Sequence, residues 1–229
     1  MTAAETNGKV ILITGASSGI GAATARAAAA AGYRVVLAAR SSDKLEALAA
    51  EIGGLAAKCD VTEWTDQEAV VSRALAEYGR IDVAFANAGF TVERGFKGET
   101  PERWRSMILT NIYGVALTIR ACYDALVETK GHLLLTSSLV GRLVTPGSLY
   151  SVTKFGVTAM GESARQELNG TGVRVTVIEP GIVSTPFYHQ QWEGMLEADD
   201  IARAVMYAVS QPAHVDVNEI LVRPTAQDV

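Results

Sequence analysis

The 229-residue sequence has few of the features that mark secreted, metal-binding or membrane proteins. Its two cysteines, Cys59 and Cys122, stand apart in apolar surroundings, which predicts small core residues in a reducing compartment. The three histidines are scattered, and no cluster of histidines, cysteines and carboxylates predicts a metal site. No apolar run approaches the roughly 20 residues of a membrane span, and residues 1–8 are too short and polar for a signal peptide. We therefore expect a cytoplasmic protein that does not associate with membranes.

The sequence also lacks an excess of positive charge. It has 20 lysines and arginines against 25 aspartates and glutamates, which gives a formal net charge of −5, and no basic cluster stands out. Binding along a nucleic-acid backbone needs such a cluster, so nucleic acid is not an expected partner. Repeats and linkers are missing as well, and the length fits one domain over residues 1–229.

The most informative stretch is residues 9–32. Residues 9–14 form an apolar, β-branched run typical of a buried parallel strand, and residues 22–31 form an alanine-rich helix that ends before Gly32. Between them lies the turn Gly15-Ala16-Ser17-Ser18-Gly19-Ile20-Gly21, whose glycines let the backbone approach a ligand closely. A strand, a glycine turn and a helix N-terminus together favour a bound phosphate and predict a dinucleotide site. Because the glycine spacing differs from the commonest fingerprint, a tight turn without a ligand is the alternative.

Apolar runs alternate with helical patterns along the rest of the chain. This alternation predicts a single-domain Rossmann α/β fold, with a doubly wound seven-stranded parallel sheet and helices on both faces. The further strands are expected at residues 33–39, 55–59, 81–86, 132–136, 173–179 and 218–222, and the further helices at 43–52, 65–78, 101–129, 150–169 and 199–210.

Arg40 follows the second predicted strand, where the adenosine ribose lies in a dinucleotide fold. A carboxylate at this point would favour a free 2′-hydroxyl, but Ala39 provides none. A guanidinium can pair with a 2′-phosphate in bidentate geometry, so Arg40 favours NADP(H) over NAD(H). The alternative is a solvated surface arginine.

Polar residues follow the third and fourth predicted strands. Asp60 would face the adenine edge, but the spacing equally allows Asp60 or Thr62 to cap the next helix. Asn87-Ala88-Gly89 is a small polar turn beside which a ribose could pass. Asn111 lies within a predicted helix, where an amide usually has a particular hydrogen-bonding task.

Tyr150 and Lys154 are four residues apart, so both project from the same side of the predicted helix. The pKa of tyrosine is near 10, and lowering it by about three units for catalysis near neutral pH needs on the order of 4 kcal/mol of phenolate stabilisation. The Lys154 ammonium and the helix N-terminus can supply part of this. A core tyrosine beside a solvated lysine is the alternative.

These segments occur in one order along the chain: Thr14-Gly-Ala-Ser-Ser-Gly-Ile-Gly21, Asp60, Asn87-Ala-Gly89, Asn111, Ser137-Ser138, Tyr150-x-x-x-Lys154 and Pro180-Gly-Ile-Val-Ser-Thr185. In this order, the sequence resembles the short-chain dehydrogenase/reductase family over roughly residues 9–225. The resemblance implies that Tyr150 is the general acid/base, and that Lys154 lowers its pKa and holds the ribose hydroxyls. It also implies that Ser138 orients the substrate oxygen and that Asn111 holds a water in the proton relay.

The resemblance further implies which residues line the ligands. The cofactor-binding set is Gly15, Ser17, Ser18, Gly19, Ile20, Gly21, Arg40, Asp60, Val61, Asn87, Ala88, Gly89, Tyr150, Lys154, Pro180, Gly181, Ile182 and Thr185, of which Ile182 and Thr185 would bind the carboxamide. The substrate set is Ser138, Val140, Tyr150, Phe187 and Trp192, and the last two belong to an apolar lid at about residues 186–197. Arg94 and Arg142 are candidate anchors for a substrate carboxylate, although arginines are more often solvated.

The catalytic serine presents a choice of register. In relatives it usually lies thirteen residues before the tyrosine, a count that Ser137 meets, whereas Ser138 is twelve before Tyr150. We assign Ser138, because the order of Gly141 and Gly147 fits the family if one residue is missing between Gly147 and Tyr150.

The expected function is an NADP(H)-dependent oxidoreductase that interconverts a small ketone or aldehyde, or a 3-oxo or 3-hydroxy acid, and its alcohol, without a metal. A 3-oxoacyl-carrier-protein reductase is one alternative, although the net charge of −5 offers no basic docking patch. A non-catalytic NADP(H)-sensing protein is another, but such a protein need not keep Tyr150 and Lys154. The resemblance also suggests a homotetramer or homodimer, with contacts through residues 101–129, residues 150–169 and the last strand.

Overall fold

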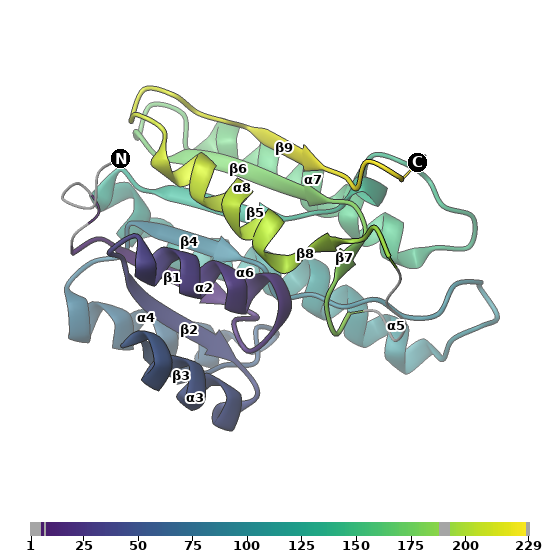
Figure 1. Ribbon diagram of the computed structural model, residues 1–229, viewed down its shortest axis with the longest axis horizontal. Helices are drawn as coiled ribbons and strands as arrows, with labels where there is room; N and C mark the ends of the chain where they lie inside the picture. The colour runs from purple at the N-terminus through teal and green to yellow at the C-terminus, as the bar shows by residue number, and fades with distance from the viewer. Residues whose placement is uncertain (1–5, 7, 188–192, 228–229) are drawn as a thin grey trace.

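The computed structural model describes residues 6, 8–187 and 193–227. Its centre is a sheet of seven parallel strands in the order β3-β2-β1-β4-β5-β6-β9 (Figure 1). The strands are β1 (Val10–Thr14), β2 (Arg34–Ala39), β3 (Leu55–Lys58), β4 (Val83–Ala86), β5 (His132–Thr136), β6 (Arg174–Pro180) and β9 (Glu219–Val222). This confirms the predicted doubly wound α/β fold.

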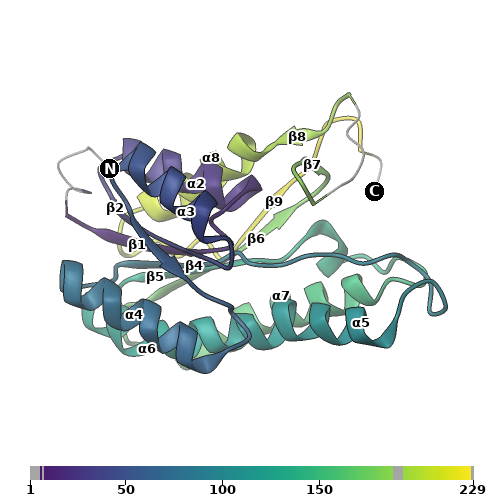
Figure 2. The same ribbon diagram turned by 90° about the horizontal axis from the view of Figure 1, so that it is seen from below.

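Helices cover both faces of the sheet, as Figure 2 shows. One face carries α2 (Gly19–Ala30), α3 (Ser42–Ile52) and α8 (Ala198–Ser210), and the other carries α4 (Trp64–Tyr78), α6 (Gly114–Thr129) and α7 (Leu149–Glu167). Helix α5 (Pro101–Ile108) leads into α6 through the π-helical turn Leu109–Tyr113. In the described ranges, no helix combines the length and apolarity needed to cross a membrane.

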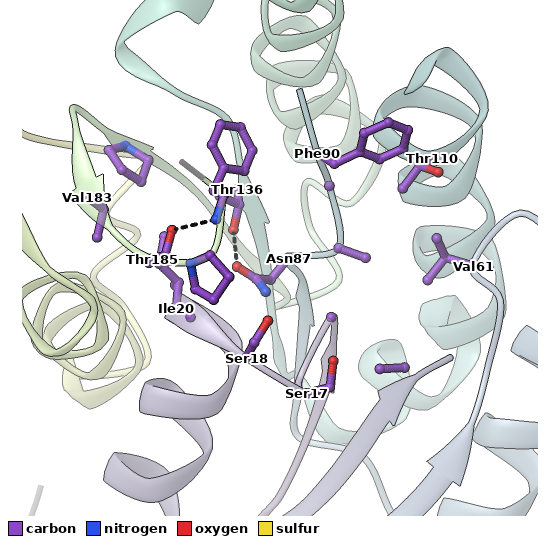
Figure 3. A pocket seen from close by; sticks show the side chains of 18 of the residues that line it. Ser17, Ser18, Ile20, Val61, Asn87, Phe90, Thr110, Thr136, Val183 and Thr185 are labelled. Atoms are coloured by element: carbon purple, nitrogen blue, oxygen red, sulfur yellow. Dashed lines mark hydrogen bonds between the residues drawn. The ribbon is translucent and has the colours of Figure 1, made fainter. Parts of the chain in front are cut away.

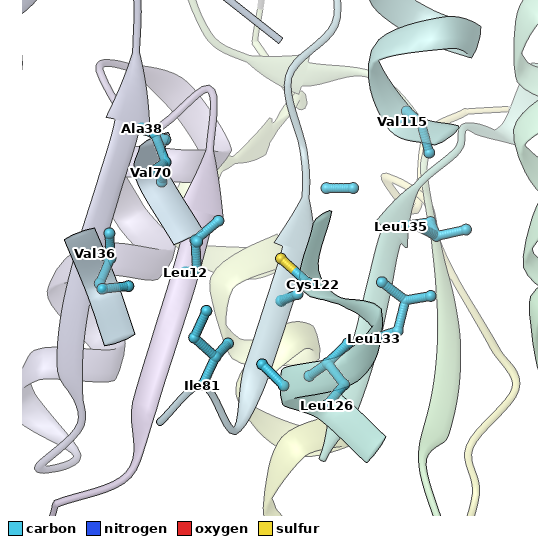
Figure 4. Close-up of a cluster of buried hydrophobic side chains, with 14 of the residues drawn as sticks. Leu12, Val36, Ala38, Val70, Ile81, Val115, Cys122, Leu126, Leu133 and Leu135 are labelled. Carbon is cyan, nitrogen blue, oxygen red and sulfur yellow. The ribbon is translucent and has the colours of Figure 1, made fainter. Parts of the chain in front are cut away.

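The core consists of two apolar layers, because alternate side chains of each strand point to opposite faces. On β1, Leu12 packs into the layer under α4, α6 and α7, whereas Ile13 packs under α2, α3 and α8. Cys59 and Cys122 are buried free thiols in the first of these layers, where Cys122 contacts the surrounding aliphatic side chains (Figure 4). Burial raises the pKa of both thiols to about 12, so the thiolates do not form at neutral pH.

The structure differs from the predicted elements where a pattern was short or ambiguous. Two short strands that the sequence did not predict, β7 (Val183–Ser184) and β8 (Leu196–Glu197), pair with each other. They bracket most of the expected lid at 186–197, of which residues 188–192, including Trp192, lie outside the described ranges. The predicted helical region 101–129 is divided by the π-helical turn and is less buried than expected, since Ile108 is 40% and Tyr113 47% exposed.

Candidate active site

The carboxyl ends of the central strands surround one pocket of about 340 Å³, in the size range of ligand sites (Figure 3). It lies where the chain leaves β1 between β2 and β4, the switch point at which doubly wound sheets bind ligands. Its lining is Gly15, Ser17, Ser18, Gly19, Ile20, Ala39, Arg40, Ser41, Cys59, Asp60, Val61, Asn87, Ala88, Gly89, Phe90, Thr110, Thr136, Ser137, Ser138, Tyr150, Lys154, Pro180, Gly181, Val183, Thr185, Pro186 and Phe187.

The glycine turn after β1 is shaped by two close approaches. Gly15 has φ +66°, and a Cβ there would lie 2.8 Å from the Cα of Ala88. A Cβ on Gly21 would lie 2.4 Å from the carbonyl oxygen of Gly15, so the first turn of α2 packs directly on the loop. The N-cap of α2, Ser18, makes no side-chain cap, and the free N–H groups of this helix start at the pocket. The cradle fits a pyrophosphate.

Asn87 ties three strand ends together beneath this cradle. Its N–H donates to the Thr14 hydroxyl over 3.0 Å, and its side-chain amide donates to the Thr14 carbonyl over 3.1 Å. The hydroxyl of Thr136, the last residue of β5, donates to Asn87 Oδ1 over 3.2 Å (Figure 3). The polar turn therefore has a structural task as well as a place in the lining.

Arg40 and Asp60 lie at the adenosine end of the pocket. Arg40 is exposed at the end of β2, and no ion pair involves it within the described part of the chain. Asp60 lines the pocket, and its carboxylate also accepts hydrogen bonds from the N–H and hydroxyl of Thr62 at 3.0 and 2.8 Å. Helix α4 begins after Glu63. Neither Asp60 nor Thr62 is therefore the N-cap of α4, because Glu63 occupies that position.

Tyr150 and Lys154 reach the pocket from the first turns of α7, whose N-cap Ser148 accepts a hydrogen bond from the Ser151 N–H. The Lys154 ammonium lies 5.6 Å from the centre of the Tyr150 ring and donates to the Thr136 carbonyl over 2.7 Å. Burial lowers the pKa of Lys154 to about 8, since charge is costly away from water. At pH 7 about nine tenths of Lys154 therefore still carries a proton.

Asn111 is fully buried in the π-helical turn and is held by its neighbours. Its Oδ1 accepts from the Phe90 N–H over 3.0 Å, and its amide donates to the Phe90 carbonyl and the Thr153 hydroxyl over 2.9 and 3.1 Å. The side chain thereby joins the loop after β4 to α7. π-Helical turns are frequent at functional sites, and this one joins α5 and α6 within the region that the sequence predicted as one long helix or a pair.

Ser137 and Ser138 have different surroundings. The hydroxyl of Ser137 is buried, donates to the Lys154 carbonyl over 2.9 Å and shares a 2.7 Å hydrogen bond with Thr158. The Ser138 hydroxyl makes only long contacts of 3.3 Å, donating to the Pro180 carbonyl and accepting from the Val140 N–H. Because its hydrogen bonds are long, the Ser138 hydroxyl can turn toward a ligand at a low cost in free energy.

Arg142 is partly exposed, and it does not belong to the pocket lining. It donates to Glu179 over 2.5 Å and also pairs with Glu219 on β9. The Glu179 side chain is completely buried, and burial raises the pKa of its carboxyl while the Arg142 guanidinium lowers it. The candidate carboxylate anchor is therefore engaged within the protein, and Arg94 is exposed outside the lining.

Most of the predicted site residues meet in this one pocket. The exceptions among described residues are Gly21, Asn111, Val140 and Ile182, which are absent from the lining. The N–H of Ile182 donates to Gln227, and the next residue, Val183, lines the pocket instead. Sequence reasoning also missed Thr136, whose carbonyl holds Lys154, although its place directly before Ser137 at the end of a strand could have indicated it.

No group of three histidine, cysteine or carboxylate side chains suited to a metal ion is found among residues 6, 8–187 and 193–227. That the reaction proceeds without a metal stays a prediction.

The structure is a Rossmann α/β fold whose pocket is lined by the glycine turn and by Tyr150 and Lys154. A model of the short chain dehydrogenase family matches residues 9–196. An uncharacterized oxidoreductase of Staphylococcus haemolyticus is 39% identical over 228 residues, which cover 96% of this chain and 99% of the relative.

Two similar solved structures cover nearly the whole chain. An alcohol dehydrogenase from the archaeon Thermococcus sibiricus, complexed with 5-hydroxy-NADP, is 35% identical with a TM-score of 0.90, over 96% of this chain and 97% of that one. A 3-ketoacyl-(acyl-carrier-protein) reductase from Brucella melitensis, complexed with NADH, is 27% identical with a TM-score of 0.91, over 96% and 98%. The chain belongs to the short-chain dehydrogenase/reductase family of oxidoreductases, which confirms the resemblance seen in the sequence.

The ion pair of Arg142 with Glu179 generates a pH-dependent prediction. Without Arg142, the pKa of the buried Glu179 carboxyl would be raised further above its value in the unfolded chain. The free energy of unfolding would then fall as the pH rises from the unfolded pKa to the folded pKa of this carboxyl. Arg142→Met should therefore lower the free energy of unfolding by about 2 kcal/mol at pH 8, because the half-exposed guanidinium compensates a buried charge, and by less at pH 5. Urea unfolding followed by circular dichroism at one protein concentration measures both values.

Two controls accompany this measurement. The double variant Arg142→Met/Glu179→Gln should recover the loss at pH 8, since an amide has no charge to compensate, and Glu219→Gln should change little because Glu219 is 47% exposed. An equal loss from Arg142→Met at both pH values would show that the pair does not work through the charge of Glu179.

Proposed function

We propose that the protein is an NADP(H)-dependent oxidoreductase that interconverts a small carbonyl compound and its alcohol. The observation that carries this proposal is that Ser138, Tyr150 and Lys154 line the same pocket as the glycine cradle. A phosphate-binding turn alone would suit many nucleotides. An acid–base pair at the far end of the same pocket suits a nicotinamide cofactor, whose reactive ring must meet the substrate there.

The residues fit that cofactor from end to end. The N–H groups of the glycine turn and α2 would hold the pyrophosphate, Asp60 and Val61 would flank the adenine, and Asn87 with Lys154 would lie along the nicotinamide ribose. Thr185, together with the neighbouring Val183, would hold the carboxamide. When bound, the cofactor supplies or accepts the hydride.

Tyr150 provides the proton in this proposal. Its hydroxyl donates to the carbonyl oxygen during reduction and takes the proton back during alcohol oxidation. The positive charge of Lys154, in a site where burial weakens screening, favours the phenolate and lowers the cost of that transfer. Tyr150 lies in the first turn of α7, so the partial positive charge of the helix N-terminus also favours the phenolate.

Ser138 and Asn111 have supporting tasks. The weakly bonded hydroxyl of Ser138 would donate to the substrate oxygen and fix it beside Tyr150. The Asn111 amide is occupied by Phe90 and Thr153, so the water that we assign to the proton relay would have to bind another atom of this turn. We assign residues 1–229 to one catalytic domain and residues 186–197 to its substrate lid.

The preference for NADP(H) rests on Arg40. Its exposed guanidinium at the adenosine end has no competing ion pair in the described ranges, and neighbouring Ala39 adds no carboxylate. The Thermococcus sibiricus relative holds an NADP derivative, which accords with this preference.

Activity assays with active-site variants test the chemistry. Tyr150→Phe should reduce NADPH-dependent turnover of aldehydes and ketones by about 10²- to 10⁴-fold, because the proton donor is lost. The matched control Tyr78→Phe, which removes a hydroxyl outside the pocket on α4, should keep its activity. Ser138→Ala should lose about 10²-fold in kcat, whereas Ser137→Ala should act mainly on stability. The reverse result for the two serines would show that our register is wrong.

The cofactor preference has its own test. Arg40→Gln should raise the KM for NADPH by about 10- to 100-fold, the value of a lost charge-assisted pair, and leave the KM for NADH nearly unchanged. Arg73→Gln on α4, an exposed arginine outside the pocket, is the matched charge control. Equal effects of Arg40→Gln on both cofactors would refute the assignment.

We also propose that the protein is a homotetramer, with a dimer as the smaller alternative. The packed pair α5 and α7 exposes Ile108 and Phe155 at 40% and 39%, and the edge strand β9 exposes Leu221 at 42%. Light scattering should give about four chain masses for the native protein, and Ile108→Glu/Phe155→Glu should reduce this mass, since charge opposes burial of that face. Leu75→Glu on α4 is the matched control and should leave the mass unchanged. A monomeric native protein would exclude the proposal.

A further inference from the structure

The described pocket lining is poor in positive charge at the end where the substrate would bind. Its two basic side chains are Arg40, which lies at the adenosine end, and Lys154, which is buried and donates to Thr136. Both are already committed to the cofactor or to Tyr150 in the function proposed above. A substrate carboxylate would find no further cation among the described lining residues.

The walls at the substrate end are aromatic and neutral. The rings of Tyr150 and Phe187 meet edge to face, with their centres 5.6 Å apart and an interplanar angle of 62°. Phe90 and Thr110 also line the pocket and lie beside each other (Figure 3). Such walls gain free energy from apolar contact and provide only hydroxyl groups for polar recognition.

Arg142, four residues after Ser138, adds no net positive charge to this region. Arg142 pairs with both Glu179 and Glu219, so the three side chains together carry one net negative charge. Glu179 directly precedes Pro180, whose carbonyl accepts from Ser138, so this negatively charged residue is one position along β6 from the Ser138 contact. A negative charge near this contact opposes a substrate carboxylate in the pocket.

Two basic residues follow β4, but they do not add a cation to the lining. Arg94 and Lys97 are exposed, lie outside the lining and alternate with Glu93 and Glu99. Glu99 in turn pairs with Arg103. Residues 188–192, which lie outside the described ranges, read Tyr-His-Gln-Gln-Trp in the sequence, without lysine or arginine.

We infer that the substrate is an uncharged carbonyl compound with an apolar or aromatic flank, and that the pocket discriminates against a carboxylate beside the reacting carbonyl. This inference rests on the reductase function proposed above. It separates the alternatives that the sequence left open, favouring a neutral ketone, aldehyde or ester over a free 3-oxo acid. The physical reason is that an anion transferred from water to this pocket loses its hydration without gaining a partner.

The test compares probes of equal size and different charge. With NADPH at one fixed pH, we would measure kcat/KM for 4-formylbenzamide and 4-formylbenzoate, and for 3-oxobutanamide and 3-oxobutanoate. The neutral member of each pair should be favoured by about tenfold or more. An acid that reacts as well as its neutral partner would overturn the inference.

Variants make the result specific. Arg94→Gln should leave the ratio of neutral to acidic substrate unchanged, whereas a selective loss with the acids would identify Arg94 as an anchor and overturn the inference. Glu219→Gln, which removes the excess negative charge, should narrow the ratio. If none of the carbonyl probes is reduced in a Tyr150-dependent manner, the proposed function itself fails. Reduction of the acids in preference leaves that function intact and contradicts only the substrate class.

Discussion

The site depends on placing one ammonium group, that of Lys154, away from water. Burial lowers its pKa to about 8, and the carbonyl of Thr136 is its compensating hydrogen-bond acceptor. Gly89 packs closely beside this ammonium: a Cβ there would make an ordinary contact of 3.5 Å with the Lys154 nitrogen and a tight one of 3.2 Å with Asn111 Oδ1. The end of β5, the turn after β4, the π-helical turn and α7 therefore meet at this group. A charge held here can act strongly on the Tyr150 ring nearby.

In this arrangement, neighbouring residues have different tasks: one stabilises the framework and the next faces the pocket. Ser137 faces inward and anchors α7 through the Lys154 carbonyl, while Ser138 faces the pocket with weak contacts. The same division continues on β6, where Glu179 points into the protein to meet Arg142 and the Pro180 carbonyl accepts from Ser138. The segment from Ser138 to Arg142 is thus held at both ends by consecutive residues of one strand. Such attachment fixes the position of Ser138, while its hydroxyl is held by two long hydrogen bonds of 3.3 Å.

The sequence predicted the elements whose apolar pattern was long enough, and it failed where position depended on distant partners. All seven strands of the main sheet were found from their short apolar runs, although the edge strands β3 and β9 are only partly buried. The pair β7 and β8 was missed because two residues carry no period. Val183 lines the pocket and the predicted Ile182 does not, a difference of one residue that no local pattern in so short a strand could indicate. The partners of Arg142 lie 37 and 77 residues later, which no local pattern could indicate.

The placement of charged side chains explains why the residues that stabilise the fold differ from those proposed to select the substrate. The groups proposed for catalysis come from strand ends and the first turns of α7, which the buried core holds rigidly. The substrate end is formed instead by Phe90 and Phe187 on loops, where side chains change without disturbing the sheet. Arg142 belongs to the framework, because its removal would leave the buried carboxylate of Glu179 without its ion-pair partner. Since this guanidinium is engaged within the protein, the proposed substrate selectivity would come from the neutral walls of the pocket.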